Sequence, residues 1–153
     1  MLIVHAFAPP NSVKVLIALE ELGLDYQLLP VNIRQGEQKH EAFIALNANA
    51  KVPVLVDPVG DKGQPLVLTE SAAILIYLAE RYGRLMPSEG VKRARVFEQL
   101  FFHSSALSPA FGQSGYFQKL ASEPNPAAIA RFHGEAMSLA QSAQRPVMTS
   151  VII

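Results

Sequence analysis

The stretch from Lys51 to Ser71 constrains the fold more than any other part of the chain. It opens with an apolar run entered through a proline, residues 52–56, crosses a loop rich in Gly, Asp and Pro, and ends in a second apolar run. Two such runs separated by turn-forming residues predict a β-hairpin. Apolar residues recur at helical spacing from Ala72 onward, so Ser71 is expected to be the N-cap or a first-turn residue of a helix.

These features together favour one kind of ligand. The N–H groups at the start of that helix and the Ser71 hydroxyl suit a carboxylate. Glu70 beside them suits an ammonium group, so the pair matches an α-amino acid head group. A cis bond between Val52 and Pro53 would leave the N–H and C=O of Val52 facing outward, where an extended peptide could pair with them. A small γ-linked peptide would satisfy both halves.

The surrounding segments predict an alternation of strands and helices. Asn11 and Ser12 offer N-cap side chains to the first helix, and Gly23 marks its end. The expected elements are a strand at 2–7, that first helix, a strand at 25–31, a short helix at 40–47, the hairpin and the helix after Ser71. This β-α-β-α-β-β-α order predicts that the first two strands are parallel. Residues 1–82 are therefore expected to form one α/β unit.

The second half of the chain carries helical patterns. Residues 83–90, with Pro and Gly among them, are expected to form a linker. Helical periodicity then covers residues 91–107 and 126–144, and residues 108–117 between them contain their own Pro and Gly breaks. An α/β unit followed by a short all-α unit is therefore predicted.

Composition excludes several classes of function. The 153 residues are 50% hydrophobic and 17% charged, which is typical of a soluble globular protein with one domain and part of a second. The 13 basic and 13 acidic side chains balance, so no net charge recruits nucleic acid or an anionic membrane. With no recognisable signal peptide and no apolar run of about 18 residues, a cytoplasmic protein is expected.

The absence of cysteine restricts the chemistry further. Disulfide scaffolds, thiolate zinc sites and cysteine nucleophiles are all excluded. Any thiol chemistry must therefore use a thiol that arrives with the ligand. The four histidines are scattered without the spacing of metal ligands, so no metal site is expected.

Val52-Pro53 followed by Glu70-Ser71, in this order and at this spacing, resembles the glutathione transferase family. The resemblance covers residues 1 to about 140. It implies a thioredoxin-like domain at residues 1–82 that binds glutathione as co-substrate, then an all-α domain at residues 91–153. The family's helical domain continues for several more helices, so a truncated domain is expected, and residues 145–153 match nothing in the family at that position.

The resemblance also implies roles for single residues. Pro9-Pro10-Asn11 resembles the Thr-Pro-Asn signature of the bacterial Nu-class-like and yeast prion-like members, which lack an active-site cysteine. Pro9 stands where relatives place a hydroxyl or thiol, and a proline cannot donate a hydrogen bond to a thiolate. Asn11 and Ser12 are therefore the expected catalytic residues. From the residues alone, Asn11 could equally be a plain N-cap that touches no ligand.

The resemblance assigns further contacts to glutathione. Gln38 and Lys51 match positions that contact its glycine end, although both could also lie in a solvated loop. Arg131 resembles an arginine that reaches the glutathione of the neighbouring subunit, or it is a surface side chain. The glutathione-binding set expected is Asn11, Gln38, Lys51, Val52, Pro53, Glu70, Ser71 and Arg131.

The expected function is activation of the glutathione thiol, either for conjugation to a small hydrophobic electrophile or for disulfide reduction. A homodimer is expected, as is usual in the family. Two alternatives remain. The chain could be a non-catalytic interaction or regulatory module with the same fold, which Pro9 and the missing helices favour, or a product that folds only in residues 1–82.

Overall fold

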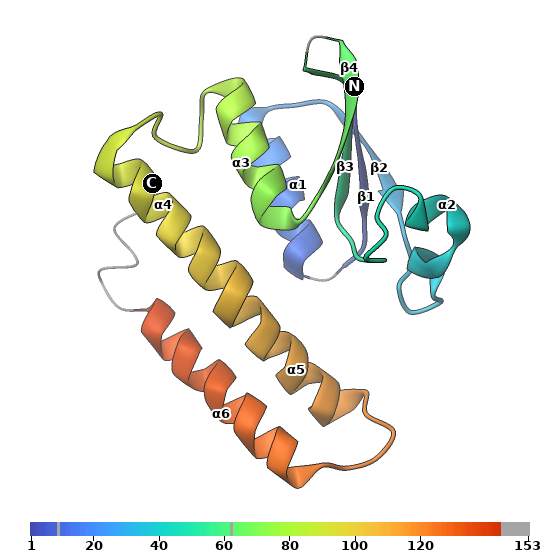
Figure 1. Cartoon of the computed structure of the whole chain (residues 1–153), viewed down its shortest axis with the longest axis vertical. Helices are drawn as coiled ribbons and strands as arrows, with labels where there is room; N and C mark the ends of the chain where they lie inside the picture. Colours follow the sequence, from blue (N-terminus) through green and yellow to red (C-terminus); the bar gives the residue numbers. More distant parts are fainter. Residues whose placement is uncertain (9, 62, 145–153) are drawn as a thin grey trace. The chain divides into compact units, whose positions relative to one another are not determined.

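The computed structural model describes residues 1–8, 10–61 and 63–144. The chain divides into two compact units, Met1–Met86 and Pro87–Ile153. The division falls within the predicted linker, and Figure 1 shows an α/β unit followed along the chain by a unit of helices. The expectations for Pro9 and for residues 145–153 lie outside the described residues.

The first unit is built around a four-stranded mixed sheet with the strand order β2-β1-β3-β4. Strands β1 and β2 are parallel, whereas β3 pairs antiparallel with both β1 and β4. The elements are β1 (Leu2–Ala6), α1 (Pro10–Leu22), β2 (Tyr26–Pro30), α2 (Glu41–Ile44), β3 (Val54–Asp61), β4 (Gln64–Thr69) and α3 (Ser71–Tyr82). The predicted order of strands and helices, and with it the thioredoxin-like fold, is confirmed.

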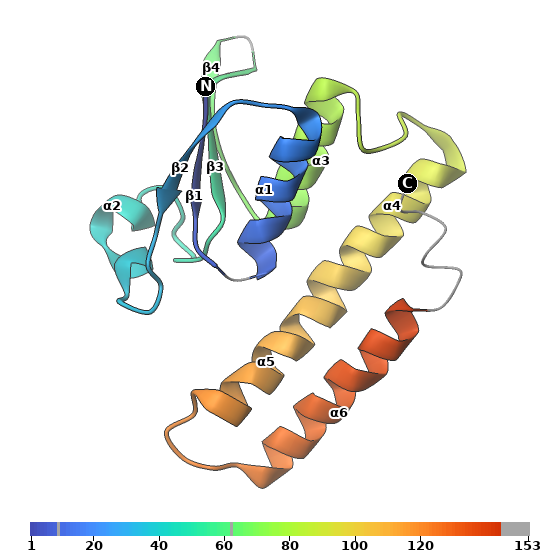
Figure 2. The same ribbon diagram turned by 180° about the vertical axis from the view of Figure 1, so that it is seen from behind.

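Helices cover both faces of this sheet. Helices α1 and α3 lie side by side on one face, and α2 lies on the other (Figures 1 and 2). Alternate residues of β1, namely Leu2, Val4 and Ala6, point into the main core together with Leu19 of α1 and Leu78 of α3. A smaller cluster beneath α2 contains Val31, Phe43 and Val54. The buried side chains of β1 thus lie on the face covered by α1 and α3, whereas Ile3 and His5 on the other face are half-buried.

The hairpin strands are longer than predicted. Strand β3 runs to Asp61 and β4 starts at Gln64, with Asp61 paired to Gln64 and an irregular register between Asp57 and Asp61. Gly60 permits this arrangement: its φ is +50°, and a Cβ there would lie 1.8 Å from the Gln64 carbonyl oxygen. A side chain at position 60 would therefore break the hairpin.

The second unit contains α4 (Gly90–Phe102), a π-helical turn (His103–Leu107), α5 (Ser108–Lys119) and α6 (Pro126–Ala143). The expectation that the helix breaks at residues 108–117 is wrong. Pro109 is the second residue of α5 and follows the π-helical turn directly, and the backbone of Leu107 and Ser108 before it stays helical. Figure 2 shows α4, the π-helical turn and α5 as one continuous rod, with α6 returning beside α5.

Helix α6 begins as its sequence predicts. The side chain of Asn125 accepts a hydrogen bond from the Ala128 N–H at 3.0 Å, and Pro126 follows as the first helical residue. None of the helices in the described part of the chain is long and apolar enough to cross a membrane.

Candidate functional site

A small cleft in the first unit gathers residues from four segments of the chain. It has a volume of about 60 Å³ and is lined by Asn11, Asn47, Lys51, Val52, Pro53, Glu70 and Ser71. These residues come from the start of α1, the loop after α2, the entry to β3 and the junction of β4 with α3. Six of the residues expected at a glutathione site thus line one cleft.

The wall before β3 presents backbone groups. The Val52–Pro53 peptide bond is cis, which is the condition for the outward-facing Val52 expected from the sequence. Pro53 is buried, and Val54 is the first residue of β3 to pair with either β1 or β4. Val52 therefore precedes both ladders, at a position where its backbone polar groups can serve a bound peptide.

The opposite wall is the start of α3. Ser71 is the first residue of this helix, so the expectation of a first-turn serine is confirmed. Glu70 precedes it as N-cap with φ +65° and ψ +115°, and its side chain is exposed and makes no capping hydrogen bond. No acidic residue lies in the first turn of α3, so its N–H groups and positive dipole end have no carboxylate of their own there.

The start of α1 differs from the expectation. The helix begins at Pro10, so Asn11 and Ser12 lie within its first turn, and the prediction that they are N-caps is wrong. Asn11 lines the cleft. Ser12 is fully buried, does not line the cleft, and accepts a hydrogen bond from the Phe7 N–H at 3.4 Å. Its hydroxyl thus joins the end of β1 to the start of α1.

Gln38 and Arg131 are not among the residues that line the cleft. Gln38 lies in a one-turn 3-10 helix, Glu37–Lys39, and its Oε1 is buried without a hydrogen-bond partner in the structure. Arg131 belongs to α6 in the second unit, where its guanidinium lies 6.0 Å from the centroid of the Phe132 ring. The roles expected for both residues stay predictions.

Asn47 is a cleft residue that sequence reasoning missed. It is the last residue of the short helix expected at 40–47. The structure buries it to 8% exposure, and its amide donates a hydrogen bond to the Lys51 carbonyl oxygen at 2.7 Å. The signal that could have found it is an asparagine four residues before Lys51-Val52-Pro53, because asparagine side chains hold local turns by bonding to the backbone two to four residues further on.

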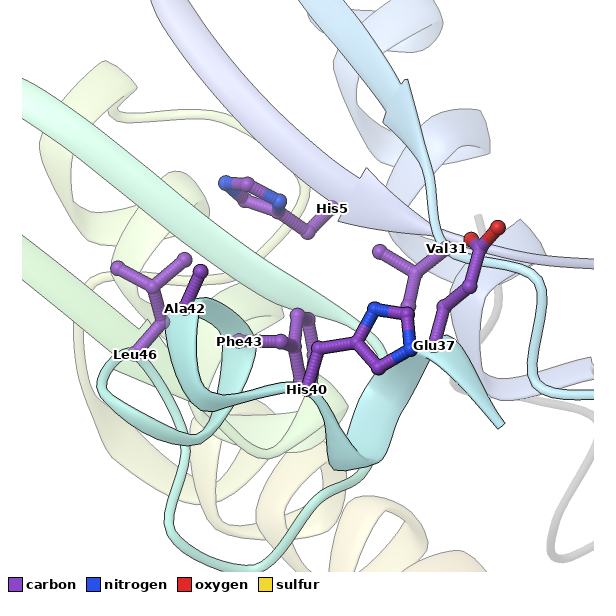
Figure 3. A pocket seen from close by; sticks show the side chains of 7 residues that line it. All are labelled: His5, Val31, Glu37, His40, Ala42, Phe43 and Leu46. Carbon is purple, nitrogen blue, oxygen red and sulfur yellow. The ribbon is translucent and has the colours of Figure 1, made fainter. Parts of the chain in front are cut away.

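A second cavity, of about 210 Å³, lies between α2 and the sheet (Figure 3). Its walls are mainly apolar, and the residues lining it are His5, Val31, Glu37, His40, Ala42, Phe43 and Leu46. Burial lowers the pKa of His5, whose ring meets Phe43 edge-on with centroids 6.1 Å apart. The Glu37 carboxylate is engaged by the Asn32 N–H at 2.6 Å. These side chains thus mainly pack α2 against the sheet.

No group of three or more His, Asp or Glu side chains in the described residues is arranged to hold a metal ion. The chemistry available in the cleft therefore comes from amides, a hydroxyl, one carboxylate, one ammonium group and two helix N-termini. This set is suited to binding a zwitterionic peptide and to stabilising an anion near Asn11.

The comparisons with known proteins agree with this geometry. Residues 9–81 match the family model described as "Glutathione S-transferase, N-terminal domain". The chain is 40% identical over 135 residues to the disulfide-bond oxidoreductase YfcG of Escherichia coli, covering 87% of this chain and 63% of that protein. The chain thus spans less than two thirds of the length of this curated relative.

Solved structures of glutathione transferases are also similar to this chain. The glutathione transferase of Pseudomonas putida, with one glutathione disulfide bound per subunit, has a TM-score of 0.87 and 38% identity, covering 92% of this chain and 62% of that one. A glutathione transferase homologue from Lodderomyces elongisporus, with two glutathione molecules per subunit, has a TM-score of 0.85 and 30% identity, covering 92% and 67% of the two chains.

Proposed function

The chain belongs to the glutathione transferase family, and we propose that it binds glutathione in the cleft and activates the glutathione thiol. The observation that carries this proposal is that the Val52-Pro53 wall and the Glu70-Ser71 helix start face one cleft. The cleft encloses little volume, so it would hold the γ-glutamyl head while the rest of the peptide extends along the β3 entry.

Each part of glutathione has a proposed partner. The γ-glutamyl carboxylate is bound by the Ser71 hydroxyl and the N–H groups of the first turn of α3, and its ammonium group by Glu70. The cysteinyl backbone pairs with Val52 as an added strand would. The Lys51 ammonium group meets the carboxylate at the glycine end, with Gln38 as a second proposed contact.

The thiol would then lie near the start of α1. The Asn11 amide and the positive end of the α1 dipole stabilise a thiolate there and lower the thiol pKa. The nucleophile is the sulfur of glutathione itself, because the chain contains no cysteine. Ser12 is buried, so its proposed share in catalysis is to fix the turn between β1 and α1.

Two reactions follow from a bound thiolate. On an electrophilic carbon, a carbon–sulfur bond forms and the leaving group departs with its electron pair, or the anion of an addition product is protonated. On a disulfide, the thiolate forms a mixed disulfide and the other sulfur leaves as a thiolate. The glutathione disulfide bound to the Pseudomonas putida relative and the name of the Escherichia coli relative favour the disulfide reaction.

The family resemblance extends the proposal to partners. We propose a homodimer in which Arg131 reaches the glutathione of the other subunit. A hydrophobic electrophile or a disulfide is the proposed second substrate, and the cytoplasmic location stays a prediction from the sequence.

Calorimetric titration with glutathione and glutathione disulfide tests the binding proposal. The wild-type chain is expected to bind one molecule saturably, and the double variant Glu70→Ala, Ser71→Ala to bind at least about tenfold more weakly, because hydrogen bonds to charged groups are lost. The double variant Ser88→Ala, Glu89→Ala is a matched control. It removes the same side chains from exposed positions, where Glu89 makes no capping hydrogen bond.

Absence of binding by a chain with a cooperative thermal unfolding transition would contradict the proposal. That result would leave the alternative of a non-catalytic interaction module with a glutathione transferase fold. Equal affinity of the Glu70, Ser71 variant and the wild type would place the ligand elsewhere.

A further inference from the structure

We infer that Asn47 is a positioning residue, which holds the loop of residues 47–51 in the form that presents Lys51 and Val52 to glutathione. The inference rests on the proposed function. Asn47 is not assigned a direct hydrogen bond to the ligand. Its part is to keep one wall of the cleft in place before the ligand arrives.

The hydrogen bonds of Asn47 are directed into its own loop. Its Nδ2 donates to the Lys51 carbonyl oxygen at 2.7 Å, and its Oδ1 accepts from the Asn49 N–H at 3.0 Å. Its backbone carbonyl oxygen accepts from the Ala50 N–H at 2.9 Å. Three of the next four residues are thus tied to one asparagine, at distances typical of well-formed hydrogen bonds.

Little else in the loop could hold this shape. The side chains of Ala48, Asn49 and Lys51 are exposed, whereas Asn47 is 8% exposed. Ala50 adopts a φ of +53°, a left-handed conformation that alanine disfavours. A turn with exposed side chains and one disfavoured backbone angle needs an internal polar anchor, and the Asn47 amide supplies it.

The expected consequence is a cleft wall formed in the absence of ligand. If the loop lost its anchor and adopted the binding form only a tenth of the time, the apparent dissociation constant for glutathione would rise about tenfold. The loss would act through the Lys51 wall alone, because the start of α3 is held by its own helix and by the core.

A double-variant cycle measured by calorimetric titration with reduced glutathione tests this. Asn47→Ala is expected to weaken binding about tenfold. Combining it with Lys51→Ala should cost less than the sum of the two separate losses, because both act on one wall. Combining it with Ser71→Ala, on the opposite wall, should be additive. If Asn47 only stabilised the fold, Asn47→Ala would lower the melting temperature, and its coupling to Lys51 would equal its coupling to Ser71.

Asn49→Ala serves as the control in the same loop. It removes an exposed side chain and keeps the backbone N–H that donates a hydrogen bond to Asn47. The affinity for glutathione should therefore stay within about twofold of wild type. Wild-type affinity in Asn47→Ala, or equal coupling to Lys51 and Ser71, would overturn the inference.

Hydrogen exchange on the unaltered chain gives a test that does not depend on a variant folding. The amides of Asn49 and Ala50 should exchange slowly without ligand, because both donate to Asn47. Fast exchange that becomes slow only with glutathione would overturn the inference. Slow exchange in a chain that binds no glutathione would support the anchored loop and contradict the proposed function instead, so the two failures are distinguishable.

Discussion

Glu70 combines an unfavourable backbone conformation with a proposed ligand contact. Its φ of +65° with ψ of +115° lies where residues with a Cβ are strained, and its exposed side chain makes no capping hydrogen bond. A capping role therefore does not account for a glutamate at this junction. The proposed binding of an ammonium group would account for it, since Glu70 lines the cleft.

We expect Glu70→Gly to separate stability from binding. Glycine adopts this conformation without steric cost, which outweighs its larger loss of chain entropy, so the free energy of unfolding should rise by about 0.5–1 kcal/mol. Affinity for glutathione should fall about tenfold or more because the ammonium partner is gone. Urea unfolding and calorimetric titration measure the two effects. Leu85→Gly, at an exposed residue with φ +69°, should raise stability and leave affinity unchanged.

Asn11 is expected to act on the thiol of the bound ligand. Removing its amide in Asn11→Ala takes a hydrogen bond from the thiolate, so the thiol pKa should rise by roughly one unit and the thiolate fraction at neutral pH should fall, at most about tenfold. Thiolate absorbance of bound glutathione across a pH series measures this shift. An unchanged pH profile in a variant that still binds glutathione would mean that Asn11 does not touch the sulfur.

At the scale of elements, one polar cluster ties the hairpin to α3. Asp57 of β3 is 2% exposed and accepts hydrogen bonds from the Val59 and Gly60 N–H groups at 3.0 and 3.1 Å. It also accepts from the Tyr77 hydroxyl at 2.7 Å and pairs with Arg81 at 3.0 Å. The buried carboxylate is fully partnered, so the hairpin and the helix support each other.

The charge state of Asp57 gives this cluster a pH dependence. Burial by itself raises the pKa of Asp57, but the hydrogen bonds from Tyr77, Gly60 and Val59 and the charge of Arg81 outweigh it, and the pKa lies below its ordinary value. A folded-state pKa below the unfolded value of about 3.9 adds stability above that pH. The contribution is lost as the pH falls from about 4 through the folded-state pKa.

Asp57→Asn should therefore flatten the acid limb of the stability curve. The variant keeps the size of the side chain but loses the charge, so the free energy of unfolding at pH 7 should fall by roughly 1–3 kcal/mol. The difference from wild type should shrink below about pH 4. Urea unfolding at several pH values measures it, and a difference that stays constant with pH would contradict the assignment. Asp25→Asn is the control, because it makes the same change at an exposed aspartate.

At the scale of the whole molecule, the two units differ in how they are held together. Both clusters of buried apolar residues belong to Met1–Met86. Among the described residues from 87 onward, the buried side chains are small, namely Ala110, Ser114 and Ala136. Several large apolar side chains there are exposed, with Val91 at 77% and Phe101 at 62%, and others such as Phe97 are half-buried. The helical unit therefore gains less free energy from apolar burial.

We expect the two units to unfold unequally. Amides of α4–α6 should exchange with solvent faster than those of β1, α1 and α3, and at lower denaturant concentration. Hydrogen exchange followed by mass spectrometry in a urea series measures this difference. A single transition with equal protection in both units would show that the helices share the stability of the α/β unit.

The sequence by itself determined the order of strands and helices in the first unit and, together with the family resemblance of its motifs, pointed to six of the residues that line the cleft. Periodicity, turn residues and the Val-Pro and Glu-Ser pairs are local signals, and they survive because each depends on neighbours within a few residues. Helix α5 is not predicted by the sequence, because its local signals suggest a break in the helix. Pro109 and the glycines after it look like breaks until the register shows that the proline occupies a first turn.

Only the tertiary structure decided which polar side chains face the cleft and which hold the fold. Asn11 and Ser12 are adjacent in the first turn of α1, yet Asn11 lines the cleft, whereas Ser12 is buried and accepts a hydrogen bond from the Phe7 N–H. Asp57 pairs with side chains 20 or more residues away, and Asn47 faces inward because its loop folds over it. The role of Asp57 depends on contacts between segments distant in sequence, which no local pattern specifies.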